Sequence, residues 1–471
     1  MPGRSWDASS FSEPVKAISW AVLGLSVCFG VAAAAQDVFL SERSESAQTE
    51  APALDPGATD IEPGEVPVRK PAENLAPVLE QSNLDEIIAS VKAKRVQRKW
   101  RVIPFGRLKI TADDNLFISA TNPESDVSFN LAPGIAAGWG DYSNEIRQLG
   151  EFDHYFESLD LDYEDDAQTF IFAKYVANAA FFVDHSDENA LDHDALLSSR
   201  WESSKVRLRL RMRYQVLSGA DIDVGGRVKR QVFGGTIMSR YKITEKTSLE
   251  LNLYNDSSDY ETGVDSSEWT LEDWANYQIL PKTRISVGTR IGVTDIKLGS
   301  TQTFEQVVGR VTYFAGSKLG LSLDGGVEWR QYGDDGGDDT FSVFSFATTY
   351  EPFDGTQFSA SAYRRNSASV SLVNENITRT GISARVRQRF FHRFYLAVEG
   401  TYQNSDYRST VNGEGTATRL DKTVYLKPSL SFDITKFLSA ETAYEYQHND
   451  SSSEDNSFRE NIVTFQFNLQ F

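Results

Sequence analysis

Apolar and polar residues alternate with a period of two from about residue 100 to the end of the chain. The clearest segment is the last one, in which hydroxyl and amide residues alternate with Val463, Phe465, Phe467, Leu469 and Phe471. In a β-strand this alternation places the apolar side chains on one face and the polar side chains on the other. The same pattern recurs at 249–253, 319–330 and 423–432. The chain from residue 99 on is therefore predicted to be all-β.

One apolar face and one charged face, repeated in every segment, predict a transmembrane antiparallel up-and-down β-barrel with lipid outside and water inside. A soluble β-sandwich is the alternative, but it would need strands or helices apolar enough to build a thick shared core, and the sequence offers none. About eighteen strands are expected, at 101–113, 126–139, 167–183, 193–202, 205–217, 228–242, 246–257, 267–279, 282–295, 303–314, 318–331, 340–351, 355–366, 377–390, 393–405, 420–432, 436–448 and 458–471.

The predicted connections alternate between short turns and long polar loops, which is the asymmetry of outer-membrane barrels. An even number of strands places both ends of the barrel on the periplasmic side. The long stretch 141–166 is the exception, and sixteen strands remain the alternative because it could hide one miscounted hairpin. Pro133 and Pro428 interrupt lipid-facing stretches, where a missing N–H should break the ladder or require a bulge.

Residues 1–35 have the features of a secretory signal peptide. Arg4 and Lys16 precede the apolar run 17–31, and the small residues Ala33 and Ala35 suit a cleavage site after residue 35. An uncleaved membrane anchor over 17–35 and a lipoprotein box ending at Cys28 are the alternatives. The rest of the chain, after residue 35, is therefore predicted to be exported.

Residues 36–98 are predicted to be a periplasmic linker. The stretch is acidic and rich in proline, so it cannot bury enough apolar surface to offset the entropy of ordering. A short amphipathic helix is expected from Asn83 towards Lys99, with a basic end that suits a membrane surface. The predicted domains are thus 1–35, 36–98 and 99–471.

Composition narrows the class of protein. With 47 basic and 67 acidic residues the net charge is -20, which disfavours nucleic acid as a partner. Hydrophobic residues make up 40% and mean hydropathy is -0.39, which excludes a helical-bundle membrane protein. The single cysteine excludes a disulfide scaffold. These values fit a bacterial outer-membrane protein, with outer-membrane lipid as its surroundings.

Two rows of arginine lie on the predicted inner face of the barrel. Arginine facing lipid at mid-depth would cost about 2–4 kcal/mol, so both rows should point inward. They consist of Arg207, Arg209, Arg211 and Arg213, and of Arg385, Arg387 and Arg389, with Arg379 and Arg365 towards the outer end of the second row. One interpretation is structural, with these cations paired to inward carboxylates such as Glu250, Glu272, Asp324, Glu328, Glu399, Glu441 and Glu445. The other is functional, with the arginines lining a path for an anionic solute.

No cofactor, metal site or catalytic set is predicted. The acidic clusters at 184–188, 192–194 and 334–339 suggest calcium, but their spacing is irregular and no complete EF-hand loop occurs, so solvated loop tips are the preferred interpretation. No serine, histidine and carboxylate stand in a convincing triad pattern, and the chain is not expected to be an enzyme.

Seven stretches carry a family likeness: PFGRLKITADDNLFIS (104–119), NLAPGIAAGWGDY (130–142), DHSDENALDHDALL (184–197), DIDVGGRV (221–228), TEKTSLE (244–250), EPFDGT (351–356) and VRQRFFHRFYLAVEG (386–400). The chain resembles the β-barrel porin type 2 family, outer-membrane barrels that include members linked to exopolysaccharide production. The resemblance implies a pore or an export role, names no solute and does not reach the linker. The ending Phe465, Phe467, Leu469, Phe471 looks like the signal read by the barrel-assembly machinery.

Three functions compete at this point. A diffusion pore predicts an open lumen, and the arginine rows would bias it towards small anionic solutes. Polysaccharide export predicts a wide or gated lumen. A structural anchor or adhesin predicts a plugged lumen and no conductance. A transport pore is the favoured hypothesis, with export as its most specific version.

Overall fold

A computed structural model of the chain describes residues 100–140, 142, 169–316, 318–333, 337–410 and 417–470. These residues form eighteen strands: β1 (Arg101–Asp113), β2 (Asp126–Gly140), β3 (Phe170–Phe182), β4 (Ala190–Glu202), β5 (Val206–Asp221), β6 (Gly226–Lys242), β7 (Thr247–Tyr260), β8 (Ser266–Leu280), β9 (Thr283–Ile296), β10 (Gln302–Ala315), β11 (Leu319–Gln331), β12 (Asp338–Phe353), β13 (Thr356–Ala368), β14 (Glu375–Phe390), β15 (Phe394–Ser409), β16 (Ala417–Asp433), β17 (Leu438–Ser451) and β18 (Phe458–Gln470). Two short 3-10 helices, η3 (Ser186–Glu188) and η4 (Glu454–Asn456), lie in loops.

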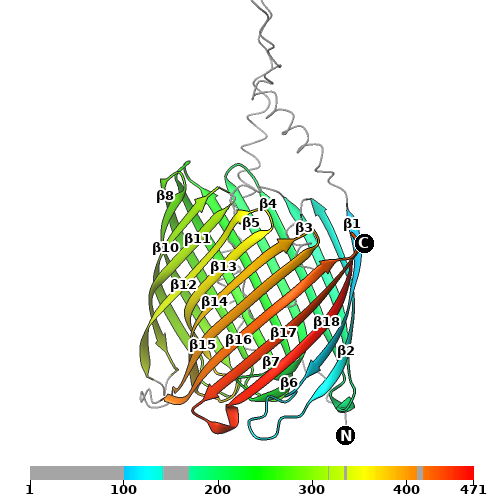
Figure 1. The fold of residues 1–471 in the computed structure, drawn as a ribbon. Coiled ribbons are helices and arrows are strands. Elements are labelled where there is room, and N and C mark those ends of the chain that lie inside the picture. The colour runs from blue at the N-terminus through cyan, green and yellow to red at the C-terminus, as the bar shows by residue number, and fades with distance from the viewer. Residues whose placement is uncertain are drawn as a thin grey trace, which may run out of the picture. The chain divides into compact units, whose positions relative to one another are not determined.

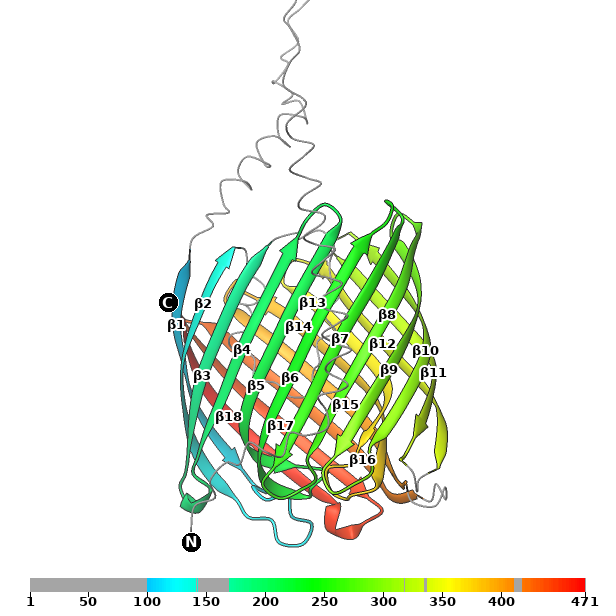
Figure 2. The same cartoon turned by 180° about the vertical axis from the view of Figure 1, so that it is seen from behind.

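The strands close into a barrel (Figures 1 and 2). Each strand pairs antiparallel with its neighbours in sequence, and β1 pairs with β18 from Phe105–Gln470 to Asp113–Ile462. Closure gives every strand a hydrogen-bonding neighbour on both sides, which a sheet in hydrocarbon requires. In the described part of the chain, no helix is long and apolar enough to cross a bilayer.

The two faces of the wall differ as the alternation predicts. Large apolar side chains such as Leu131, Ile291 and Ile382 are more than half exposed, and all three project from the outer face. On the inner face, charged side chains such as Glu272 and Arg330 are buried. An apolar outside and a polar inside are the features of a transmembrane β-barrel. The protein is therefore a barrel of the cell outer membrane.

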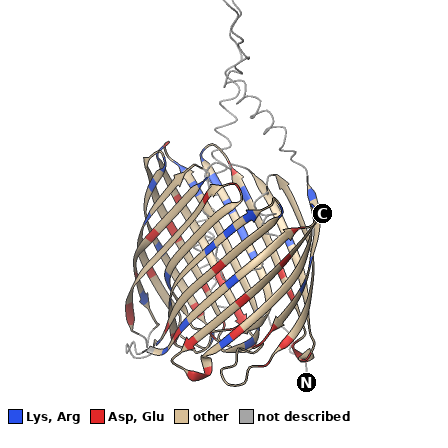
Figure 3. Cartoon of the chain, viewed as in Figure 1, with Lys and Arg blue, Asp and Glu red and all other residues tan. Residues whose placement is uncertain are grey.

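The two rims of the barrel differ in their connections. One rim carries Arg101 and Gln470, the two ends of the barrel, together with short turns such as 281–282 and 354–355. The opposite rim carries longer loops such as 114–125 and 369–374, and acidic residues are frequent there (Figure 3). Short turns and chain ends mark the periplasmic rim, and long loops mark the extracellular rim.

Both prolines interrupt pairing on one side only. The pairing of β2 with β3 stops for two residues at Pro133, and that of β16 with β17 stops for two residues at Pro428. In both cases the pairing resumes in the same register. The ladder is locally broken, as predicted, and no bulge is needed.

The pairing of β12 with β13 covers only the periplasmic part of these strands. It runs from Phe353–Thr356 to Phe344–Arg364, so residues 338–343 of β12 have no partner on β13 and pair only with β11. The seam between these two strands is thus open towards the extracellular rim. The extracellular half of the hairpin of β13 and β14 folds inward instead.

The predicted fold class is confirmed, and the count is eighteen rather than sixteen. Predicted and observed strand ends differ by at most four residues, at the extracellular ends of β5 and β15. Those strands extend further because their hairpins continue to pair beyond the alternating stretch. The predicted signal peptide, the linker with its helix, most of the insertion 141–166 and Phe471 lie outside the described residues.

Candidate functional site

The first arginine row projects from the inner face of β5. Its members alternate with Leu208, Met212 and Tyr214, which are exposed on the outer face. At the periplasmic end, Arg207 makes a two-pronged contact with Glu202 on β4, with Nε 3.1 Å and Nη2 2.8 Å from the two carboxylate oxygens. Arg209 and Arg211 also interact with neighbouring groups.

At mid-height the row joins a buried charge cluster. Asp194 on β4 lies 3.0 Å from Nζ of Lys174 on β3 and 2.9 Å from Nε of Arg213. The side chains of Asp194 and Lys174 are only 2% and 5% exposed. Buried charges must be paired, so these contacts support a structural role for this end of the row.

The second row lies on the inner face of β14. Arg385 is 4.0 Å from Glu399 on β15, and Arg387 stacks over Tyr395 with its guanidinium carbon 4.6 Å from the ring centroid. Arg389 pairs with Asp354, in the periplasmic turn between β12 and β13, at 2.5 Å. Of the acidic partners predicted from sequence, Glu399 is therefore found beside this row.

Arg385 and Arg387 line a cavity of about 450 Å³ inside the barrel. Its wall is built from β1–β6 and β14–β18, and it mixes both signs of charge. The charged lining includes Arg107, Lys109, Asp194, Arg385, Arg387, Glu399, Lys427, Glu441 and Glu445. Lys427 and Glu445 form an ion pair at 3.0 Å. A solute in this cavity would meet polar groups on every side.

A third charged group, on the wall formed by β6–β11, was not predicted. Glu250 on β7 accepts from Arg240 at 2.7 Å and from Arg310 at 2.9 Å. Glu272 on β8 accepts from Arg290, which also approaches Asp324 at 3.5 Å. Three carboxylates that the sequence suggested as partners of the arginine rows thus have other arginines as partners.

Trp274 covers this charged wall from β8. The guanidinium of Arg310 lies over its ring, 4.1 Å from the centroid, and the side chain is 1% exposed. The ring fits because its neighbour is Gly288: a Cβ there would lie 2.7 Å from the indole carbons. The wall of β6–β11 is consequently packed with paired charges and aromatic rings.

The turn between β5 and β6 crosses the extracellular mouth. This turn and the strands β14–β16 lie on opposite sides of the ring: seven strands separate β6 from β14, and six separate β16 from β5 in the other direction. Asp223 in the turn nevertheless accepts hydrogen bonds from Arg379 on β14 and Tyr407 on β15. Arg419 on β16 donates to the carbonyl oxygens of Ile222 at 3.0 Å and Asp223 at 3.2 Å. A turn that reaches the opposite wall must span the opening.

The hairpin of β13 and β14 covers another part of the mouth. The amide of Val264, in the loop between β7 and β8, donates to the carbonyl of Val370 at 2.8 Å. Lower down, Asn366 donates to Glu328 on the inner face of β11 at 3.1 Å. These contacts require the extracellular half of the hairpin to fold inward, which explains the open seam between β12 and β13.

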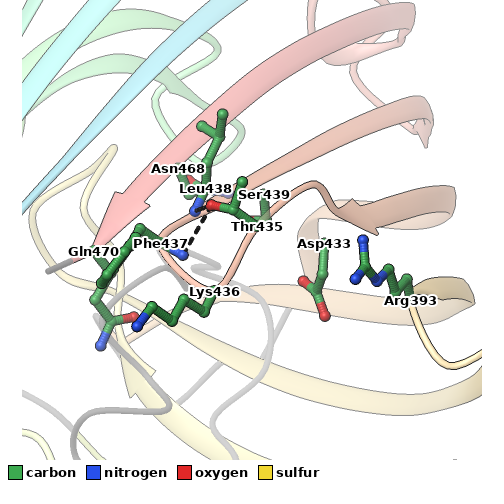
Figure 4. Close-up of a pocket in the computed structure, with 9 residues that line it drawn as sticks. All are labelled: Arg393, Asp433, Thr435, Lys436, Phe437, Leu438, Ser439, Asn468 and Gln470. Atoms are coloured by element: carbon green, nitrogen blue, oxygen red, sulfur yellow. Dashed lines mark hydrogen bonds between the residues drawn. The ribbon is translucent and has the colours of Figure 1, made fainter.

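A second pocket, of about 430 Å³, lies at the periplasmic rim (Figure 4). It surrounds the turn between β16 and β17, where the hydroxyl of Thr435 accepts from the amides of Phe437 and Leu438, both at 3.1 Å. Asp433 and Arg393 face each other at one end, and Gln470 lies at the other. Its lining comes from this turn and the strand ends around it, so it is not part of the interior path.

The predicted assembly signal lies on the last strand. Phe465 and Leu469 are exposed on the outer face, and the ring of Phe467 packs edge-on against Phe465 with the centroids 4.9 Å apart. Their reading by an assembly machinery stays a prediction. Within the described ranges, no three histidine, cysteine or acidic side chains are grouped closely enough to hold a metal ion.

No family model matches the chain, and no curated protein matches it. The resemblance to the β-barrel porin type 2 family therefore stays a prediction. Among solved structures, the chain is similar to OccAB2 of Acinetobacter baumannii, with a TM-score of 0.41, 11% identity and coverage of 79% of this chain and 98% of that one. It is also similar to two Pseudomonas aeruginosa structures, each with 9% identity and with 79% of this chain covered. One is OccK2 (OpdF) in complex with glucuronate, with a TM-score of 0.40 and 98% of that chain covered. The other is OpdK with vanillate, with a TM-score of 0.39 and 99% of that chain covered. Likeness at this level bears on neither solute nor mechanism.

Proposed function

We propose that the protein is an outer-membrane pore for anionic solutes, with export of an acidic exopolysaccharide as its most specific version. The observation that carries this proposal is the cavity inside the closed barrel, which is lined by Arg385 and Arg387 on β14 and by Lys427 on β16. Charged groups lining a pore select ions by sign.

The structure favours unequal roles for the two arginine rows. Arg207 and Arg213 are fixed by ion pairs with Glu202 and Asp194 on β4, and each of these carboxylates also pairs with a second cation, Arg200 or Lys174. In the second row, Arg385 stands 4.0 Å from its carboxylate, beyond hydrogen-bond distance. Anion preference is therefore assigned to the second row, and wall stability to the first.

The test is single-channel recording of the refolded full chain in planar bilayers under a chloride gradient. The expected result is discrete conductance steps with a reversal potential on the anion-selective side. Refolded barrels that insert but conduct no current, even after the contacts across the mouth are removed by mutation, would overturn the pore.

A plugged anchor or adhesin barrel is the second candidate function. It is favoured by the two segments that cross the extracellular mouth, the turn at Asp223 and the hairpin at Val370. In that case current would stay absent even after the crossing contacts are removed by mutation. A pore closed by a movable gate would instead begin to conduct.

A further inference from the structure

The carboxylate of Asp223 occupies a pocket that belongs to the opposite wall. Arg379 and Tyr407 donate to its two oxygens, and Arg419 donates to Tyr407 Oη at 3.0 Å. One guanidinium group and one phenol thus donate to the carboxylate, and the second guanidinium group donates to the phenol and adds a positive charge beside it, on three adjacent strands. The carboxylate that occupies this pocket is supplied by the chain itself, from Asp223 in the turn between β5 and β6.

The pocket is held in place by contacts that do not involve Asp223. Arg379 also donates to Ser367 Oγ at 2.6 Å. Arg419 is fixed by Asp421, with Nε 2.9 Å from Oδ2, and stacks over Tyr407 at 4.2 Å. Tyr407 is fully buried. Because these donors are oriented by their own wall, the pocket should keep its shape when Asp223 leaves, and a preorganised pocket binds better.

The occupant, in contrast, sits on a turn that can move as a unit. Asp221 pairs with Arg230 at 2.8 Å within the same hairpin, so the hairpin stays paired without the contacts across the mouth. Gly225 adopts a positive φ of 77°, and Gly226 follows it. Burial opposes ionisation of Asp223, but Arg379, Tyr407 and Arg419 outweigh it and lower its pKa. The occupant is therefore an ionised carboxylate at neutral pH.

We propose that Arg379, Tyr407 and Arg419 form a carboxylate-binding site at the extracellular mouth, in which Asp223 stands in for the carboxylate of a solute. A sugar acid that takes the place of Asp223 releases the turn between β5 and β6 and opens the mouth. This inference rests on the proposed pore for its transport consequence, but the binding site itself does not depend on conductance.

Asp223 and the carboxylate of the solute compete for this site, and this competition sets the apparent affinity of the protein for the solute. The site is free only in the fraction of molecules whose turn has left it, and the observed affinity falls by that fraction. Asp223→Asn removes the charge of the competitor, so the variant should bind galacturonate more tightly than the natural chain in calorimetry. Galactose, which has the same ring without a carboxylate, should bind neither protein.

The experiment uses two readouts on the full chain. The first is the rate at which an impermeant maleimide labels Val224→Cys, a half-buried position beside Asp223. The second is open probability in planar bilayers. Galacturonate is expected to raise both severalfold, and galactose to change neither. Asp223→Asn should be open without any sugar acid, whereas the matched control Glu351→Gln, at an exposed carboxylate near the other rim, should behave as the natural chain.

The outcomes separate this site from the proposed pore. If Asp223→Asn conducts but galacturonate changes neither labelling nor opening, the carboxylate site is wrong and the pore stands. If galacturonate speeds labelling while no variant conducts, the site stands and the pore is wrong. If Arg419→Gln retains the response to galacturonate, Arg419 is not part of the site as proposed and the assignment fails.

Discussion

Nζ of Lys174 lies 3.0 Å from Oδ2 of Asp194 inside the barrel wall. Asp194 also accepts from Arg213, so one carboxylate on β4 contacts a cation on each neighbouring strand, β3 and β5. Removing the carboxylate of Asp194 costs free energy, because Lys174 and Arg213 would remain charged in a poorly solvated part of the wall. The contact therefore contributes to stability through the penalty for removing it.

Asp194→Asn should destabilise the barrel by about 3 kcal/mol, the lower end for breaking a buried pair, since Arg213 is a third exposed and water screens part of its charge. Urea unfolding in lipid vesicles, followed by circular dichroism, measures the change. Asp354→Asn is the matched control, because its side chain is 89% exposed and the loss there should be small. Equal midpoints for both variants would contradict a role for burial.

Arg385 and Arg387 should govern the sign of the permeating ion. Replacing both by Gln is expected to move the reversal potential towards that of an unselective pore, because both line the interior cavity. The control is the double change Glu202→Gln with Arg207→Gln, which leaves net charge unchanged and removes the pair of Arg207 with Glu202, together with the contact of Glu202 with Arg200. A larger shift in the control than in the β14 variant would reverse the assignment of the two rows.

A disulfide should trap the inward-folded hairpin of β13 and β14. A Cβ at Gly299, in the loop after β9, would lie 3.1 Å from Cγ1 of Val373, which places the two positions within reach of a disulfide. Gly299→Cys with Val373→Cys should cross-link under mild oxidation, visible as a mobility shift on non-reducing gels. Conductance of the cross-linked barrel should be low and should recover with reductant.

The single variants Gly299→Cys and Val373→Cys control for the substitutions themselves. The chain contains only one other cysteine, Cys28, so an intramolecular cross-link can be assigned by mass spectrometry. Absence of the link under oxidation would mean that the hairpin does not fold over the mouth.

The wall of the barrel was predictable because lipid and water impose opposite demands on successive residues. Leu208 and Arg209 are neighbours in sequence and face opposite media, so the pattern alone gives the strand and its orientation. Partners within the lumen were not predictable in the same way. Arg310 donates to Glu250, which lies three strands away in the ring. The stagger of the strands that brings the two side chains together cannot be predicted from the sequence of either strand.

The contacts across the mouth were missed for a different reason. Asp223 belongs to a short acidic turn with adjacent glycines, which has the composition of a solvated loop tip. The sequence placed Arg379 on the inner face towards the outer end, but it gave no sign that Tyr407 would be buried and the Arg419 side chain only 11% exposed, and so each in need of a polar partner. Which loop supplies that partner depends on a fold across the opening, and alternation carries no information about it.

His185 should make the extracellular loops sensitive to pH. Its Nδ1 lies 2.8 Å from Asp126 and its Nε2 lies 2.9 Å from Glu124, which joins the loop after β3 to the loop after β1. Hydrogen bonds to these two acidic side chains raise the pKa of His185 above its ordinary value. The folded form therefore favours the charged imidazole. Its stabilising effect is complete below the ordinary pKa of about 6.5 and is lost as pH rises through the raised value.

Hydrogen exchange measures this effect at residues 183–189. Protection factors, corrected for intrinsic rates, should be higher at about pH 6 than at about pH 9, because deprotonation of the imidazole weakens both contacts. His185→Asn should abolish the difference, since an amide does not titrate in this range, whereas His392→Asn on the periplasmic rim should leave it intact. Protection that rises with pH in the natural chain would show that the imidazole is neutral in the folded loops, and the contact with Asp126 would then be an ordinary hydrogen bond without a charge on the ring.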